Sequence, residues 1–128
     1  MKLLLDTHIF IWWADQPEKL STTVLSALEE EANDLLLSVV SIWEMQVKSQ
    51  AGKMKLSLPL KELVESQQTT NDIKVLPVEL AHVLALDVLP FHHKDPFDRL
   101  LLAQAIAEGM TVVSVDGVFP LYPIKLIQ

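Results

Sequence analysis

Short apolar runs separated by helical segments constrain the fold of this chain more than any other feature. Each run is continuously apolar rather than alternating, which is typical of a strand buried on both faces of a sheet. The runs are KLLL (2–5), DLLLSVV (34–40), IKVL (73–76), TVVSV (111–115) and IKLI (124–127). Strands that alternate with helices predict one α/β domain over residues 1–128, with a mostly parallel central sheet and helices on both faces.

Helix signals fill the segments between these runs. The expected helices cover residues 20–33, 41–52, 59–70, 78–89 and 95–109. Ser41 and Glu44 have the spacing of a capping box at the start of the second helix. Asp95 precedes Pro96 as the expected N-cap of the last helix, and Gly109 follows its end.

Composition narrows the classes of function. The 128 residues include no cysteine, which excludes disulfides and thiolate zinc sites, and the net charge of -7 disfavours binding nucleic acid by phosphate contacts alone. No apolar run approaches the ~20 residues of a membrane span, and Asp6 interrupts the N-terminal leucines too early for a signal peptide, so we expect a cytoplasmic protein. Half of the residues are hydrophobic, which suggests apolar surface for a partner. The lysines at 48, 53, 55 and 61 are interpreted as ordinary solvated surface.

Four acidic residues are expected on one edge of the sheet. Parallel strands end on the same edge, where ligand sites of such sheets form. Asp6 and Asp116 directly follow the first and fourth strands, whereas Glu44 and Asp98 fall in the first turns of the helices at 41–52 and 95–109. The sequence therefore predicts a cluster of four carboxylates.

Each of these acids also has an ordinary structural explanation when taken singly. Asp6 and Glu44 can cap helices, and Asp116 with Gly117 can form a turn. Asp98 differs because it shares a helical stripe with Leu102 and Ala105, four and seven residues on, and so points toward packed surface. We therefore expect Asp95 to start the last helix and Asp98 to face the site.

Clustered carboxylates favour a divalent cation. Two of them ~4 Å apart repel by about 4 kcal/mol at an effective dielectric of about 20, so that one must hold a proton unless a cation is present. All-oxygen ligands favour Mg²⁺ or Mn²⁺ over zinc. Such an ion activates water and stabilises charge on phosphate oxygens, which predicts hydrolysis of a phosphodiester.

Four motifs give the chain its resemblance to a known family. LLLDTHIFIWW, SVVSIWEM, HHKDPFDRLLLAQA and TVVSVDGVF resemble, in order and spacing, the motifs of PIN-domain ribonucleases, specifically VapC-type toxins of bacterial toxin–antitoxin pairs. The resemblance implies a PIN fold, Mg²⁺- or Mn²⁺-dependent endoribonuclease activity and inhibition by a cognate VapB-type antitoxin. Asp6, Glu44 and Asp98 match the three core acidic positions of the family, and Asp116 matches a fourth, more variable one.

The same motifs imply roles for neighbouring residues. Thr7 and Ser114 resemble small hydroxyl residues that border the site of the family as hydrogen-bond donors. Arg99 can pair with Asp95 at helical spacing or touch substrate phosphate, and we favour the pairing.

Histidines and tryptophans are given structural roles. His82 is expected to be a satisfied structural histidine, and adjacent His92 and His93 are assigned to a loop or partner-facing role rather than to metal ligation. Trp43 is expected in the core or an interface. At least one of the neighbouring tryptophans 12 and 13 should be poorly buried, which suggests a homodimer or an antitoxin contact.

Two other classes of function remain to be compared with the nuclease. One is a PIN fold that only binds partners and has lost catalysis, which the complete acidic set disfavours. The other is a receiver-like phospho-acceptor signalling domain. That class needs an acceptor aspartate after the third strand, where IKVLPVE has none, and an acidic pair after the first, where Asp6 stands alone.

Overall fold

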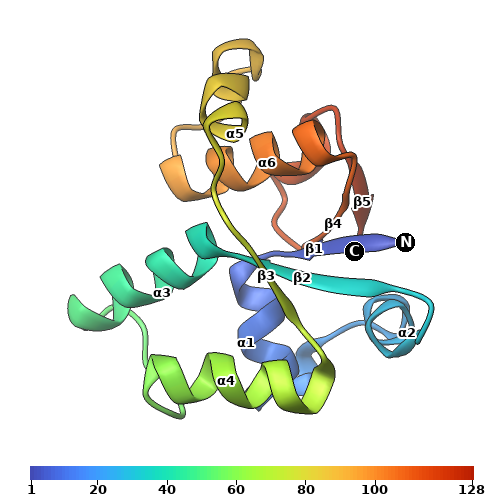
Figure 1. The fold of residues 1–128 in the computed structure, drawn as a ribbon, viewed down its shortest axis with the longest axis vertical. Coiled ribbons are helices and arrows are strands. Elements are labelled where there is room, and N and C mark those ends of the chain that lie inside the picture. The colour runs from blue at the N-terminus through green and yellow to red at the C-terminus, as the bar shows by residue number, and fades with distance from the viewer.

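The computed structural model describes all 128 residues and contains one five-stranded sheet in which every pairing is parallel (Figure 1). The strands are β1 (Lys2–Leu5), β2 (Asp34–Ser38), β3 (Lys74–Leu76), β4 (Thr111–Val113) and β5 (Lys125–Ile127). The helices are α1 (Thr7–Asp15), α2 (Thr22–Glu29), α3 (Val39–Gln50), α4 (Leu60–Asn71), α5 (Leu80–Leu84) and α6 (Pro96–Glu108), with 3₁₀ turns η1 (Pro17–Lys19), η2 (Ala85–Val88) and η3 (Phe119–Leu121). The predicted α/β class and parallel sheet are confirmed.

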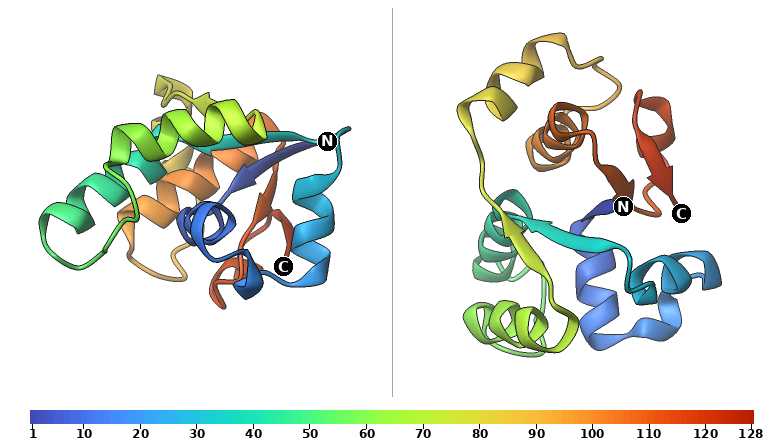
Figure 2. Two further views of the ribbon diagram at one scale, coloured as in Figure 1. Left: turned by 90° about the horizontal axis from the view of Figure 1, so that it is seen from below. Right: turned by 45° about the vertical axis from the view of Figure 1, so that its right-hand side comes forward.

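Helices cover both faces of the sheet, as the continuous apolar strands predict. Figures 1 and 2 show α5 and α6 on one side of the sheet and α1, α2 and α4 on the other. Successive strand residues face opposite sides. Leu3 and Leu5 accordingly pack in the core under α1 and α2, and Leu4 packs in the core under α6. All three are fully buried, so β1 is covered completely from both faces.

The strand order β3-β2-β1-β4-β5 places a topological switch point between β1 and β4. From β1 the chain builds outward through β2 to β3, then crosses over to β4 on the other side of β1. The connections that leave β1 and reach β4 lie on opposite faces of the sheet, which opens a crevice at the carboxyl ends of these two strands. Asp6 lies at this point, and its N–H donates to the Val113 carbonyl at 2.9 Å.

The start of α3 differs from the prediction. Strand β2 ends at Ser38, and the helix begins at Val39, so the expected capping box of Ser41 and Glu44 is wrong. Ser38 is the N-cap: its side chain accepts a hydrogen bond from the Val40 N–H at 3.0 Å and donates to buried Gln104. Glu44 consequently lies in the second turn of α3 rather than the first. The apolar valines of SVV suit a strand or a buried helical turn equally, so this pattern does not mark where the strand ends and the helix begins.

The other helix boundaries and the aromatic residues give a mixed outcome. Asp95 caps α6 as predicted, and Gly109 ends it with a left-handed φ of 65°. The tryptophans at 12 and 13 are both half-buried against the core, so neither is the poorly buried residue that we expected. Trp43 is 54% exposed and therefore not a core residue.

No helix has the length and apolar character needed to cross a membrane.

The corrected cap of α3 can be tested by substitution. Ser38→Ala should lower the free energy of unfolding by about 1–3 kcal/mol, because it removes a cap and leaves the buried Gln104 amide oxygen without its donor. Ser41→Ala is the matched control and should change the free energy by less than about 0.5 kcal/mol, since alanine suits a helix interior. Urea unfolding of both variants decides the point. A larger loss for Ser41→Ala would restore the capping box at Ser41.

Candidate metal centre

Asp6 forms the buried floor of the candidate site. It directly follows β1, is 4% exposed, and caps α1 by accepting the Thr7 N–H on Oδ1 at 2.7 Å. The Ser114 hydroxyl, at the end of β4, donates to Asp6 Oδ2 at 2.8 Å. Because β1 and β4 pair side by side, this bond joins the two strands that flank the switch point. The helix-cap reading of Asp6 is therefore correct, and its role in the site stays a prediction.

Glu44 reaches the same region from α3. Its carboxylate is buried, and the Thr7 hydroxyl donates to Oε1 at 2.6 Å. The other oxygen, Glu44 Oε2, accepts a hydrogen bond from the Lys48 ammonium, one helical turn further along α3. Thr7 therefore links Asp6 to Glu44: its N–H donates to the first carboxylate and its hydroxyl to the second. Thr7 and Ser114 are both hydroxyl donors to candidate ligands, the arrangement that the resemblance implied.

Asp98 lies in the first turn of α6 and belongs to the same acidic cluster as Asp6. Asp95 caps the helix as predicted: its Oδ1 accepts the N–H groups of Phe97 and Asp98 at 2.9 and 3.1 Å, which leaves the Asp98 side chain free of capping. Asp98 Oδ2 instead lies 3.1 Å from Nε2 of His93. Leu102 and Ala105, on the same stripe, are buried in the core under α6.

Asp116 occupies the open side of the region. It is exposed, and its Oδ1 accepts the Val118 N–H at 3.0 Å, so it does form the turn that the Asp-Gly pair suggested. Its own N–H donates to the Ser114 hydroxyl at 3.0 Å. Ser114 is thus hydrogen-bonded to both Asp6 and Asp116. Asp116 also acts on Asp98 electrostatically.

Burial and neighbouring negative charges both act on the ionisation of Asp98. Burial raises its pKa from 3.8 to about 8, with additional contributions from the negative charges of Asp95, Asp6, Glu44 and Asp116. Burial also raises the pKa of Asp6, although the hydrogen bond from Ser114 opposes that rise. A buried carboxyl group with four other acidic side chains acting on it is a place where a cation would favour the ionised form.

The donor set suits a hard divalent cation, although no three acidic or imidazole side chains converge as a ready-made metal cage. Asp6, Glu44 and Asp98 offer only carboxylate oxygens, which Mg²⁺ and Mn²⁺ prefer. The carboxylates are instead turned toward Lys48, Ser114, Thr7 and His93. Four acidic side chains without a cation repel one another, and such donors hold them apart.

Three residues differ from their predicted roles. Arg99 does not pair with Asp95: it is 6% exposed, and its guanidinium donates to the carbonyls of Pro90 and Leu89 at 2.8 and 3.3 Å. Lys48 is not free surface, and the i,i+4 spacing from Glu44 was a signal that could have found this pair. His93 is not merely a loop residue, because it contacts Asp98. No spacing rule pointed to that contact.

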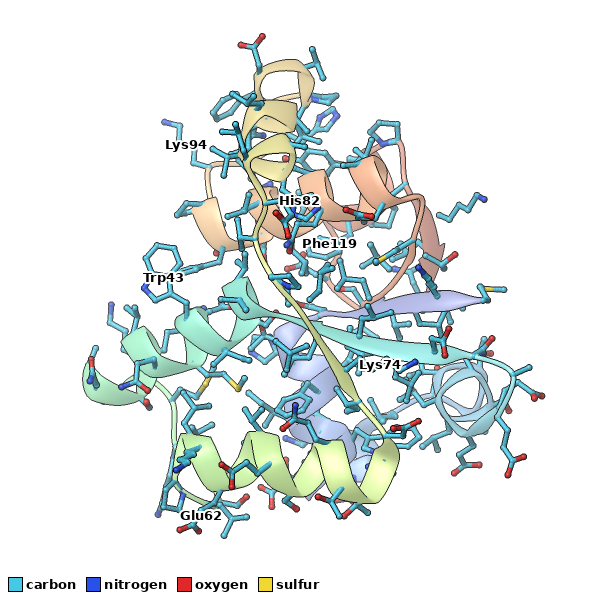
Figure 3. All side chains as sticks on the ribbon, in the orientation of Figure 1. Trp43, Glu62, Lys74, His82, Lys94 and Phe119 are labelled. Carbon is cyan, nitrogen blue, oxygen red and sulfur yellow. The ribbon has the colours of Figure 1, made fainter.

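Other predicted residues lie where the sequence placed them. Figure 3 shows His82 between α5 and α6, where it is 1% exposed and within 2.7 Å of a Glu108 carboxylate oxygen, so it is the satisfied structural histidine that we expected. The same view shows Trp43 projecting from α3 on the side where α6 begins. Its ring contacts Phe97 edge-on, with centroids 4.8 Å apart.

Comparison with known proteins establishes the family. The family model described as PIN domain matches residues 3–125, and the chain belongs to this family. Ribonuclease VapC22 from Mycobacterium tuberculosis (strain ATCC 25618 / H37Rv) is 30% identical over 115 residues, which cover 89% of this chain and 86% of that protein. The resemblance to VapC-type PIN-domain proteins is therefore confirmed.

Solved structures agree on the fold. The crystal structure of VapBC2 from Rickettsia felis bound to a DNA fragment from their promoter contains a chain that is similar with a TM-score of 0.74 and 18% identity, covering 98% of this chain and 97% of that one. FitAcB from Neisseria gonorrhoeae is similar with a TM-score of 0.66 and 16% identity, covering 98% and 96%. At these identities the likeness concerns the fold, which is the PIN fold that we predicted.

The raised pKa of Asp98 gives a pH-dependent stability. The unfolded carboxyl ionises near pH 3.8 and the folded one near pH 8, so the folded state binds the proton more tightly and loses stability as pH rises between these values. Asp98→Asn removes this loss. In metal-free buffer at pH 8 it should raise the free energy of unfolding by at least about 1 kcal/mol, with little change at pH 4. Urea unfolding with chelator measures both values.

The matched control is Asp87→Asn, which replaces an exposed aspartate of η2. It should leave the pH dependence of unfolding as it is in the unchanged chain. Equal pH dependence in the unchanged chain and in Asp98→Asn would contradict the proposed charge surplus at Asp98.

Proposed function

We propose that this chain is a divalent-metal-dependent endoribonuclease of the VapC type, which hydrolyses RNA phosphodiester bonds. The observation that carries the proposal is the environment of Asp98, a partly buried carboxyl group whose pKa rises to about 8 beside four other acidic side chains. A pocket of this kind gains stability from a divalent cation. Membership of the PIN family and the similarity to a protein named as a ribonuclease support the same conclusion.

Asp6, Glu44 and Asp98 would hold Mg²⁺ or Mn²⁺, with Asp116 contributing from the exposed side. The ion, when bound, supplies a Lewis acid for the phosphate oxygens and lowers the pKa of its water. The chain itself orients the ligands. Ser114 fixes Asp6 through its hydroxyl, and Thr7 fixes Glu44.

Lys48 carries positive charge at the edge of this site. The Glu44 carboxylate beside it raises the pKa of the Lys48 ammonium, and the charges of Asp95 and Asp98 contribute. Lys48 is therefore held in its charged form between the carboxylates. A fixed cation here balances part of the negative charge that an RNA phosphate would meet on approach.

We also propose a cognate VapB-type antitoxin and a second copy of this chain as partners. The supporting observation is the apolar surface over α5, η2 and the following loop, where Leu80, Leu84, Val88 and Phe91 are 63–83% exposed. Apolar groups gathered in this way are typical of a surface that another protein covers. Light scattering of the chain alone, and with the product of a short neighbouring reading frame, measures both associations.

The remaining alternative is a PIN domain that binds its partner without cutting RNA. The four carboxylates disfavour it, because a chain with no catalytic use for them would keep a destabilising charge surplus. Metal binding and RNA turnover by the same preparation distinguish the two functions.

Cleavage of a mixed RNA pool tests the proposed activity. The purified chain should cut RNA with Mg²⁺ or Mn²⁺ and stop when chelator is added. Asp98→Asn removes a ligand rather than an outer hydrogen-bond partner, so its rate should fall by more than the roughly 10- to 100-fold that loss of such a partner costs. Gel or sequencing readout of the products measures the rate.

Asp87→Asn, at an exposed position of η2, serves as the control and should cut like the unchanged chain. Cleavage that persists with chelator, or at an undiminished rate in Asp98→Asn, would contradict the proposed site. A folded chain that binds its antitoxin and metal but cuts no RNA in the pool would favour the partner-binding alternative.

A further inference from the structure

The Tyr122 hydroxyl lies where three segments of the chain meet behind Asp98. Tyr122 follows η3 near the end of the chain and is 4% exposed. Its hydroxyl oxygen lies 3.3 Å from Arg99 Nη1, 3.3 Å from the His93 backbone nitrogen and 2.7 Å from His93 Nδ1. The opposite ring nitrogen, His93 Nε2, lies 3.1 Å from Asp98 Oδ2. A continuous chain of polar contacts therefore runs from Arg99 through Tyr122 and His93 to Asp98.

The hydrogen atoms along this chain can be counted. A guanidinium and a backbone N–H are donors only, so Arg99 and the His93 backbone take the two acceptor positions of the Tyr122 oxygen. The single hydroxyl hydrogen then has one acceptor within reach, which is His93 Nδ1. A hydrogen on Nδ1 instead would direct three donors at one oxygen and leave the hydroxyl hydrogen unpaired in a buried place. Neutral His93 therefore carries its hydrogen on Nε2.

The consequence reaches the candidate metal ligand. With the hydrogen on Nε2, His93 donates to Asp98 Oδ2, and this bond favours the ionised carboxylate in one orientation. Asp98 Oδ1 accepts no hydrogen bond from the protein and stays available to a cation. When Asp98 is ionised, the other tautomer would set two acceptors against each other at the same place and turn the carboxylate away.

We infer that Tyr122 is a positioning residue: its hydroxyl selects the Nε2-protonated tautomer of His93, which in turn orients Asp98 for a divalent cation. The part of this inference that concerns the cation rests on the proposed function. The part that concerns the tautomer rests on the hydrogen bonds alone. The two parts therefore have separate tests.

Packing holds the three residues in these positions. Arg99 also donates to the carbonyls of Pro90 and Leu89, which fastens the loop before α6 to the helix itself. The Phe91 ring lies against the Arg99 guanidinium, 3.8 Å from its centroid to Cζ. The His92 ring meets the Tyr122 ring edge-on, with centroids 4.9 Å apart. The loop that carries His93 is thus anchored on both sides of it.

Nitrogen NMR of the imidazoles tests the tautomer without any metal. At an alkaline pH where imidazoles are neutral, His93 should show a hydrogen-free Nδ1 and a protonated Nε2. Tyr122→Phe keeps the ring and removes the hydroxyl, so the His93 signals should shift toward a mixture of the two tautomers. A protonated Nδ1 in the unchanged chain, or an unaltered tautomer in Tyr122→Phe, would overturn the inference.

Calorimetric titration with Mn²⁺ tests the effect on Asp98. Tyr122→Phe should weaken Mn²⁺ binding by about 10-fold, as loss of an outer hydrogen-bond partner does at metal sites. His93→Gln places an amide N–H near the position of Nε2 and needs no tautomer selection, so it should bind Mn²⁺ within a few-fold of the unchanged chain. In the His93→Gln background, Tyr122→Phe should have no further effect on Mn²⁺ affinity.

A control separates this role from a general loss of packing. His82→Gln changes a buried imidazole that contacts the opposite end of α6, through Glu108, and should leave Mn²⁺ affinity unchanged. Equal losses from Tyr122→Phe with His93 present and with Gln at 93 would show a merely structural role and overturn the inference. If the unchanged chain binds no Mn²⁺, the metal site of the proposed function fails, and the NMR result still decides the tautomer.

Discussion

Complete burial of β1 between two helical layers is the constraint on which the rest of the structure depends. Leu3, Leu4 and Leu5 are all fully buried, the odd-numbered pair on one face and Leu4 on the other. A shift of β1 by one residue relative to its neighbouring strands would exchange these faces and bring Asp6 into the sheet. The register of β1 is therefore strongly fixed. Asp6 is therefore held at the end of the strand, at the switch point, and the other carboxylates are arranged around it.

Placing acidic side chains at this edge costs free energy, and the structure offsets the cost with a donor for each carboxylate. Asp6 receives the Ser114 hydroxyl and Glu44 receives Thr7 and Lys48. Asp98 has only His93, and it is the group whose pKa rises to about 8. Of these three carboxylates, the least compensated is thus the partly buried Asp98, whereas Asp116 is the exposed member of the cluster. A charge surplus at Asp98 favours metal binding over further internal pairing.

The same region combines rigid support with open apolar surface. Arg99 and Tyr122 are buried and fasten the loop before α6, whereas Phe91 and Val88 on that loop and η2 are exposed. Trp43 is also exposed beside Glu44. A partner that covers these apolar groups would therefore contact elements that carry the candidate ligands. This proximity connects the proposed antitoxin contact with the proposed catalytic site.

Sequence patterns alone determined the class of fold and predicted the edge of the sheet on which the acidic set lies. Continuous apolar runs predicted a parallel sheet, and each acid was placed by its position after a strand or at a helix start. The division of roles between Asp95 and Asp98 also followed from the sequence, because an N-cap and a buried stripe both have fixed spacing along a helix. The site roles assigned to the four carboxylates remain a prediction that the geometry supports.

Only the tertiary structure decided which side chains meet these carboxylates. The α3 cap at Ser38, the carbonyl contacts of Arg99 and the approach of His93 and Tyr122 to Asp98 were all missed. Helical and strand periodicity gives the face on which a side chain lies, but it does not give the partner that packing brings to that face. Tyr122 reaches His93 across 29 residues of sequence because β4, η3 and α6 pack together, and no local spacing encodes that distance.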